Sequence, residues 1–417
     1  MLISKKNILL FISLITSLFL GFYLNEDSLG GAIFDYRGLE YLQYEFKNDF
    51  VKSFYEYDKF GHRQSPVLYI VKSVFIPIED VYVRFFFLCI FILCPYYFYK
   101  CLTVRFPTVD KNYIFPFSII IILFPTFRSY SIWPDPHMVG FLFFLISMFY
   151  FLKFEMLKKK KFKNSLISCV FLSISSYFSP NYGVLIIYFF FKFYEKKLNF
   201  NLFLIIIILN LFLSLPFFYY LFILDINFIV NKIGWDIGQN IFSITNYSNK
   251  ILIFFSIFLF YFLPFSLFLK FKWSIFINNK LITFIALMTF IFLSLNFNFR
   301  ETYNLTNSGG GFFYNLSNYL FNNNLVFFIV SFFGFLSILY LILVSKWNLI
   351  IFITLIFSNP QNTIWQANFS PILFVLIFLA FNLSIKKEIF KTKPIFIMYL
   401  YFFGYLALSL FKKYYLV

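Results

Sequence analysis

The sequence has few charged residues, and this scarcity excludes the commonest classes of protein. Only 13% of its 417 residues are charged and 61% are hydrophobic, whereas an ordinary soluble domain is about 25% charged. A soluble globule of 50.2 kDa needs more polar surface than this chain provides. Disordered chains are excluded as well, because they are poor in apolar residues. The mean hydropathy of +0.80 predicts an all-α, polytopic integral membrane protein.

Histidine, cysteine and flexible linkers are also scarce. The chain has two histidines and four cysteines, and the cysteines lie in or beside apolar runs without a CxxC pair. This placement is typical of small core residues and not of a redox pair or a metal cluster. No stretch rich in glycine, serine or proline divides the chain, and no repeat recurs at a fixed period. The simplest organisation is therefore a single membrane domain over residues 1–417.

Long apolar runs are what the sequence has in excess, and they predict 11 to 13 transmembrane helices. The first run covers residues 7–24 and lacks a small-residue cleavage site, so we expect an uncleaved span and not a secretory signal. The remaining runs lie at about residues 81–99, 113–127, 137–154, 165–179, 182–194, 201–224, 251–269, 281–297, 325–345, 347–358, 369–385 and 394–411.

The basic residues are concentrated in alternate loops. With a cytoplasmic N-terminus, the inner loops hold 22 of the 35 basic residues and four of the 18 acidic ones. This asymmetry follows the positive-inside rule and predicts a plasma (inner) membrane protein whose N-terminus lies in the cytoplasm. The net charge of +17 is then explained by membrane orientation, and no nucleic acid partner is expected.

The first outer loop, residues 25–80, contains ten of the 18 acidic residues. Within it, apolar residues recur at steps of three and four over residues 38–57, which predicts one amphipathic helix lying in the membrane interface. A second apolar stretch, residues 66–78, is too short to span and is expected to be interfacial or re-entrant. The loop is thus predicted to form a structured cap, although simple solvation explains most of its acids.

Two groups of residues in this loop could carry chemistry. Glu26, Asp27 and Asp35 bracket the Gly30–Gly31 turn where the first span meets the outer interface. A carboxylate at this position can act as a base or hold a cation near phosphate. After the amphipathic segment, His62 and Arg63 could contact an anionic group.

The second outer loop gathers Arg128, Trp133, Asp135 and His137 within ten residues. Pro134 and Pro136 restrict the backbone on both sides of Asp135. His137 is expected near the start of a span, where the helix N-terminus favours anions. A structural ion pair between Arg128 and Asp135 is as good an interpretation as a binding site.

Four segments give the chain a resemblance to the GT-C superfamily of polytopic glycosyltransferases. They are NEDSLGGAIFDY after the first span, HRQSPVLYIV at the re-entry to the membrane, WPDP before the fourth span, and SPNYG in the following hairpin. In that superfamily, a long outer loop with an acidic motif and interfacial helices follows the first span. The resemblance covers roughly residues 1–195 and otherwise rests on the number of spans and on a late loop that contains proline.

The resemblance implies an inverting sugar transfer at the outer, periplasmic face. The donor would be a polyprenyl-phosphate sugar, because nucleotide sugars are cytoplasmic, and the acceptor would be a lipid, a glycan or a protein. Asp35 is the favoured general base and Asp27 the next candidate. Residues that could bind substrate are Glu26, His62, Arg63, Arg128, Asp135 and His137. A divalent cation, Mg²⁺ or Mn²⁺, could assist, but no spacing requires one.

Two other functions remain open. An O-antigen-type polysaccharide polymerase also has many spans and outer loops, but its polyanionic substrates favour arginine-rich loops, whereas these are acidic. A lipid or oligosaccharide transporter usually places charges at the bilayer centre, where the predicted spans have few.

Overall fold

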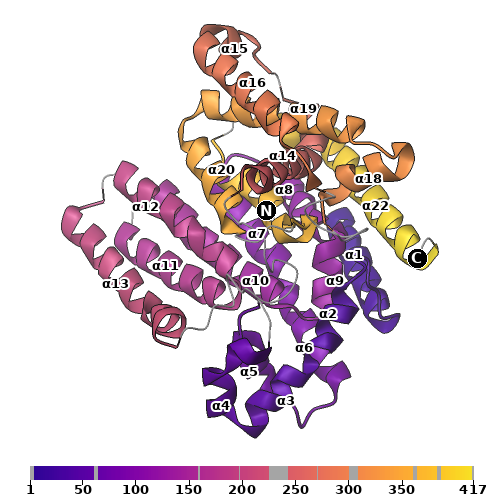
Figure 1. Cartoon of the computed structure of the whole chain (residues 1–417), viewed down its shortest axis with the longest axis vertical. Coiled ribbons are helices and arrows are strands. Elements are labelled where there is room, and N and C mark those ends of the chain that lie inside the picture. The colour runs from indigo at the N-terminus through magenta and orange to yellow at the C-terminus, as the bar shows by residue number, and fades with distance from the viewer. Residues whose placement is uncertain are drawn as a thin grey trace. The chain divides into compact units, whose positions relative to one another are not determined.

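The computed structural model describes residues 4–60, 64–157, 160–196, 198–224, 243–269, 271–299, 309–359, 364–382 and 387–415. Over these residues the secondary structure is helical without a strand (Figure 1), which confirms the predicted all-α class. By the contacts between its helices, the chain forms two compact units. Unit 1 comprises Met1–Asn231 with Phe390–Val417, and unit 2 comprises Lys232–Ile389.

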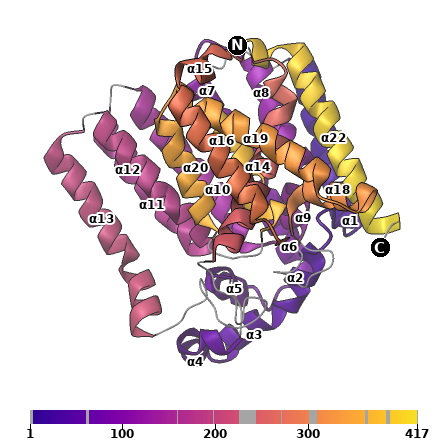
Figure 2. The same ribbon diagram turned by 45° about the horizontal axis from the view of Figure 1, so that its top comes forward.

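Unit 1 is built around α10 (Pro136–Met156), which is apolar on all sides and largely buried, as expected for a helix enclosed by others. Helices α7 (Leu93–Arg105) and α11 (Lys161–Phe178) pack against it, and α13 (Phe200–Phe218) packs on the far side of α11 (Figure 2). The other helices of this unit outside the first outer loop are α1 (Lys5–Tyr23), α6 (Asp80–Phe91), α8 (Lys111–Ile119), α9 (Pro125–Ile132), α12 (Ile186–Glu195) and α22 (Thr392–Tyr415).

The predicted span at residues 113–127 is a bent pair of helices. The segment Lys111–Leu123, which ends in a 3-10 turn at Ile120–Leu123, meets α9 at an angle of 68°. Pro125 is the first residue of α9. Because proline lacks an N–H and restricts the residue before it, the first helix ends there and a second one begins. The bend delivers the second outer loop to the end of α1.

The first outer loop folds into short helices, which are α2 (Ala32–Gly38), α3 (Glu40–Asn48), α4 (Phe50–Tyr55) and α5 (Val67–Ser73). The single helix predicted over residues 38–57 is wrong. The chain breaks at Asp49, whose backbone is not helical (φ −147°, ψ 89°) and whose carboxylate accepts a hydrogen bond from the Lys52 N–H at 2.9 Å. An aspartate that caps the next helix in this way ends the preceding one.

The apolar face of these loop helices packs against protein. Leu42 and Phe46 of α3 form a buried cluster with Tyr57, Tyr69 and Tyr220. Tyr220 lies in a π-helical turn, Tyr219–Ile223, that directly follows α13. The cluster therefore ties the cap to the end of a membrane helix.

Unit 2 is centred on α14 (Ile244–Ser266), which packs closely against α19 (Leu325–Val344). A methyl group at Gly334 would lie 2.1 Å from the Phe255 carbonyl oxygen, and Ser331 donates to the Leu252 carbonyl at 3.1 Å. Small residues at a crossing are typical of membrane helix pairs. The unit also contains α15 (Ser274–Asn278), α16 (Lys280–Leu295), α18 (Gly311–Phe321), α20 (Trp347–Ser358) and α21 (Ile372–Leu379).

Seven helices in the described part of the chain are long and apolar enough to cross a membrane, or eight if the bent pair is one span. This supports an integral membrane protein. The number is below the 11 to 13 runs of the sequence because several runs form helices that are short or partly polar. Among them, Lys280–Leu295, Trp347–Ser358 and Gln366–Leu379 are apolar but shorter.

Residues from alternate loops gather at opposite ends of unit 1. At the end predicted to be cytoplasmic, Glu155 pairs with Arg105 at 3.2 Å and with Lys192 at 3.9 Å. At the other end, the turn that follows α1 meets the first turns of α6, because Arg84 donates to the Asn25 side chain at 3.2 Å. This separation supports the predicted alternation of loops. The side that faces the cytoplasm remains a prediction from the positive charge.

Cysteine labelling tests that orientation. In a chain without its four native cysteines, Glu45→Cys is expected to react with a membrane-impermeant thiol reagent added to intact cells, because α3 belongs to the outer loop. Lys161→Cys is expected to react only after permeabilisation. Labelling of Lys161→Cys from outside would reverse the topology.

Candidate active site

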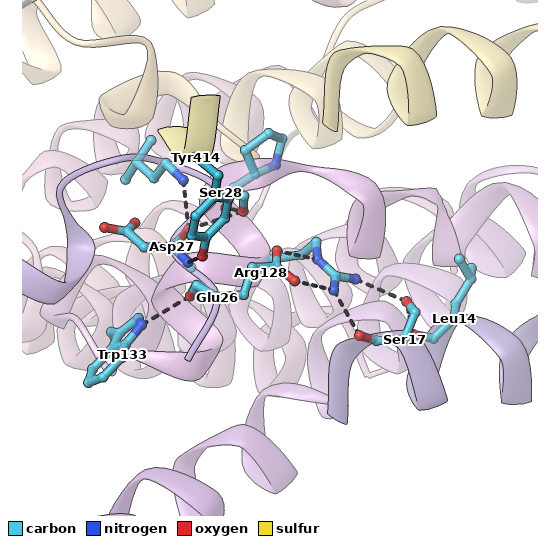
Figure 3. A network of polar contacts seen from close by, with 11 residues as sticks. Leu14, Ser17, Glu26, Asp27, Ser28, Arg128, Trp133 and Tyr414 are labelled. Atoms are coloured by element: carbon cyan, nitrogen blue, oxygen red, sulfur yellow. Dashed lines mark hydrogen bonds and ion pairs between the residues drawn. The ribbon is translucent and has the colours of Figure 1, made fainter. Parts of the chain in front are cut away.

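Glu26 and Arg128 form a buried ion pair where α1 ends (Figure 3). Asn25 adopts a left-handed conformation, with φ of 52°, and so turns the chain at the helix end. Arg128 donates to both oxygens of the Glu26 carboxylate, at 2.7 and 2.5 Å, and its remaining N–H groups reach the hydroxyl and carbonyl oxygens of Ser17. The sequence suggests an ion pair between Arg128 and Asp135, whereas the structure pairs Arg128 with Glu26.

The Asp27 carboxylate also has a structural role, because it binds backbone N–H groups of the turn that follows it. The residue is only 1% exposed. Its carboxylate accepts hydrogen bonds from the backbone N–H groups of Gly30, Ala32 and Ile33 at 3.0, 3.2 and 3.4 Å. These bonds shape the glycine turn, where Gly30 has a φ of +89°, and they satisfy N–H groups at the start of α2. Asp27 thus holds the segment that carries Asp35.

A polar pocket lies where the two outer loops meet. Asp35 of the first loop and Asp135 of the second both line it, although 100 residues separate them. We call this space the polar pocket. Its other lining residues are Ala32, Tyr36, Gln64, Tyr69, Lys72, Tyr130, Trp133, Pro134 and Pro136.

The protein raises the pKa of both carboxyl groups of the polar pocket toward neutral pH. The surrounding protein and the charge of Asp27 raise the pKa of Asp35 to about 6, although the residue is partly open to solvent. Burial, reinforced by the charge of Asp35, raises the pKa of Asp135 to about 7, against the lowering effect of hydrogen bonds from His137 and Gln64. A carboxyl group with such a pKa is suited to accept a proton near pH 7.

Asp135 is fixed by the loop that carries it. It is the N-cap of α10, and one of its oxygens accepts from the His137 N–H at 2.7 Å. Pro136 occupies the first position of that helix, where its missing N–H costs nothing. The other carboxylate oxygen lies 3.5 Å from the side-chain nitrogen of Gln64. The two loops are therefore linked at the polar pocket itself.

Lys72 brings a positive charge to the same pocket. The residue is 3% exposed, and its ammonium nitrogen lies 3.8 Å from the centre of the Tyr36 ring. Among the described residues, no carboxylate forms an ion pair with it. Burial lowers the pKa of Lys72 to about 8, which nearby acids partly oppose. The side chain is thus predominantly charged at pH 7 and available to an anion.

The His137 side chain does not line the polar pocket and instead contacts the hairpin after α11. Its ring stacks on Tyr182 with 5.1 Å between centroids, and its two nitrogens lie 3.3 Å from the Ser179 hydroxyl and 3.2 Å from the Tyr182 hydroxyl. The SPNYG segment therefore holds the start of α10 in place. The ring is not among the residues that line the polar pocket.

The eight residues proposed from the sequence thus fall into three groups. Asp35 and Asp135 meet in the polar pocket, while Glu26, Asp27, Arg128 and His137 make structural contacts around it. His62 and Arg63 lie outside the described residues. Sequence reasoning missed Lys72 and Tyr36, whose only signal was a lone cation in an apolar helix and an aromatic beside the favoured aspartate.

An apolar groove is linked to the first outer loop, next to the polar pocket, by a hydrogen bond between Ser65 and Tyr177. It is lined by Tyr177, Phe212, Leu213, Leu215, Pro216 and Tyr219, along the exposed helix α13. The Tyr177 hydroxyl donates to the Leu213 carbonyl, in the turn that precedes Pro216. On its other side, the Tyr177 carbonyl accepts from Ser65, the neighbour of the pocket residue Gln64.

The described residues offer few side chains that could bind a metal ion. In the described part of the chain, no group of three or more His, Cys, Asp or Glu residues could hold one. The polar pocket offers two carboxylates beside a lysine, which does not fit a dedicated divalent-cation site.

The comparisons with known proteins give no relative. No family model matches the chain, and no curated protein or solved structure is significantly similar to it. The resemblance of residues 1–195 to the GT-C superfamily therefore remains a hypothesis.

Proposed function

We propose that this protein is a membrane glycosyltransferase that moves a sugar from a polyprenyl-phosphate donor to an acceptor at the outer face of the plasma membrane. The observation that carries the proposal is the polar pocket, where two carboxyl groups tuned toward neutral pH meet a buried lysine. Sugar transfer needs a base for the acceptor and a positive charge for the leaving phosphate.

The proposed reaction is a direct displacement. Asp35 or Asp135 takes the proton of an acceptor hydroxyl as its oxygen bonds to the anomeric carbon. The bond from that carbon to the phosphate oxygen breaks on the opposite face of the sugar, and its electron pair leaves with the polyprenyl phosphate. The Lys72 ammonium offsets the charge that develops on this phosphate. Attack and departure on opposite faces invert the configuration.

The apolar groove supports a donor of this shape. A polyprenyl-phosphate sugar has a polar head and a long hydrocarbon tail. Here Tyr177 of the apolar groove accepts a hydrogen bond from Ser65, which follows the pocket residue Gln64 in the chain. The groove residues belong to helices that we expect to face lipid, so the tail would enter from the bilayer.

Donor turnover in membranes tests this function. Permeabilised membranes that contain the protein are incubated with labelled polyprenyl-phosphate hexose, with aminosugar and pentose donors in parallel, and the product is followed. We expect label to pass to an acceptor with release of polyprenyl phosphate. Movement of the intact donor between leaflets would instead indicate a transporter, and stepwise growth of a glycan would indicate a polymerase.

The pH dependence of transfer is a second prediction. A base must be deprotonated, so the rate should rise as pH passes through the range of about 6 to 7 set by Asp35 and Asp135. It should fall again above about pH 8, where Lys72 loses its charge. A rate that is constant from pH 5 to pH 9, measured with saturating donor, would contradict these roles.

A further inference from the structure

Arg84 is a second buried cation near the polar pocket, and it does not line that pocket. Its side chain, 9% exposed, pairs with Asp80 one turn earlier on α6 at 3.1 Å. Two of its N–H groups donate to the Asn25 side chain, each at 3.2 Å. Its guanidinium carbon lies 4.0 Å from the centre of the buried Trp133 ring. The guanidinium group is therefore held by contacts from three segments of the chain.

Asp80 links Arg84 to a residue that lines the polar pocket. While one of its oxygens faces Arg84, the other accepts a hydrogen bond from the Tyr36 hydroxyl at 2.5 Å. Tyr36 is buried and lines the polar pocket, and the face of its ring contacts the Lys72 ammonium at 3.8 Å. A continuous series of contacts thus leads from Arg84 through Asp80 and Tyr36 to Lys72.

We infer that Arg84, Asp80 and Tyr36 are positioning residues that hold the Lys72 ammonium in the polar pocket as an anion-binding group. A hydrogen bond to a charged acceptor fixes the Tyr36 ring, and the electron-rich face of that ring attracts a cation. The inference rests on the proposed function for the identity of the anion, which is the phosphate of the donor.

The charges around Lys72 set the direction of the expected effect. Asp80 on α6 and Glu40 on α3 favour its charged form, whereas Arg84 and burial oppose it. Asp35 and Asp135 share the pocket with it. An ammonium group removed from water without an ion-pair partner is costly, and an apolar residue at position 72 would avoid that cost. A cation held in place by aromatic and acidic neighbours is consistent with a group kept for a ligand.

The experiment measures Lys72 directly and without sugar transfer. In the full-length protein, the reaction of Lys72 with a small amine reagent is followed against pH by mass spectrometry. We expect a midpoint near pH 8 in the wild type and one about half a pH unit lower in Asp80→Asn, a smaller change than a directly contacting carboxylate produces. Glu79→Gln, which removes the exposed neighbouring acid, is the matched control and should leave the midpoint unchanged.

Binding of farnesyl phosphate, compared with farnesol, identifies the anion. At pH 8, Asp80→Asn should bind farnesyl phosphate about twofold more weakly than wild type, because fewer Lys72 side chains are charged, whereas the two should bind alike at pH 6. Tyr36→Phe keeps the ring and should retain more binding than Tyr36→Leu. An unchanged Lys72 midpoint in Asp80→Asn would overturn the inference. A shifted midpoint without farnesyl phosphate binding would support the positioning and overturn the proposed substrate.

Discussion

Asp35→Asn is expected to lower sugar transfer by about 10²–10⁴-fold while the protein stays folded, since loss of a general base has an effect of this size. An amide retains the shape of the carboxyl group but cannot accept the hydroxyl proton. Asp35 is exposed on α2 and contributes to the pocket wall, so its replacement should leave folding intact. Initial rates with labelled donor, normalised to folded protein, give the measurement.

Asp135→Asn distinguishes the two pocket carboxyl groups. If Asp135 is the base, its variant should show the large loss and Asp35→Asn a smaller one, together with an acid shift of the rate profile, because the charge of Asp35 raises the pKa of Asp135. The N-cap bond to His137 can be kept by the amide oxygen, so α10 should remain capped.

Glu45→Gln is the matched control for both variants, because Glu45 is an exposed acid of the same loop and does not line the pocket. Full activity in Asp35→Asn, Asp135→Asn and the double variant would eliminate the general-base mechanism at this pocket.

The sequence predicted the class of fold because hydropathy reports membrane burial directly, residue by residue. It also located the loop helices, since the apolar residues of α3 and α4 keep a helical spacing across Asp49. The break is marked by a single capping bond, which the Lys52 N–H donates to the Asp49 carboxylate. A periodicity averaged over 20 residues cannot register one such bond. The signal was present only as an aspartate followed by an apolar run.

The pairing of charges could not be predicted for a different reason. Glu26 and Arg128 are more than 100 residues apart, and the bend at Pro125 decides which acid the arginine meets. Proximity in sequence favoured Asp135 instead. Lys72 was overlooked because one cation hardly changes the hydropathy of an apolar helix, although a cation there becomes informative once its neighbours are known.

The Glu26–Arg128 pair gives the largest expected effect on stability. Removing one partner of a buried ion pair leaves the other charge without compensation, which typically costs about 3–5 kcal/mol. Arg128→Met should therefore lower the free energy of unfolding by about this amount, measured by denaturant titration in detergent micelles. The double variant Glu26→Gln/Arg128→Met should recover part of the loss, because no charge remains buried.

Gly21→Ala provides a test of the same pair without changing either charge. A methyl group at Gly21 would lie 2.3 Å from a Glu26 carboxylate oxygen and 2.9 Å from an Arg128 nitrogen, so the pair must shift and stability should fall. Gly38→Ala is the matched control, since nothing lies within 4 Å of the added group there. If Arg128→Met instead retained wild-type stability but lost farnesyl phosphate binding, Arg128 would be a substrate group and the structural role of the pair would be wrong.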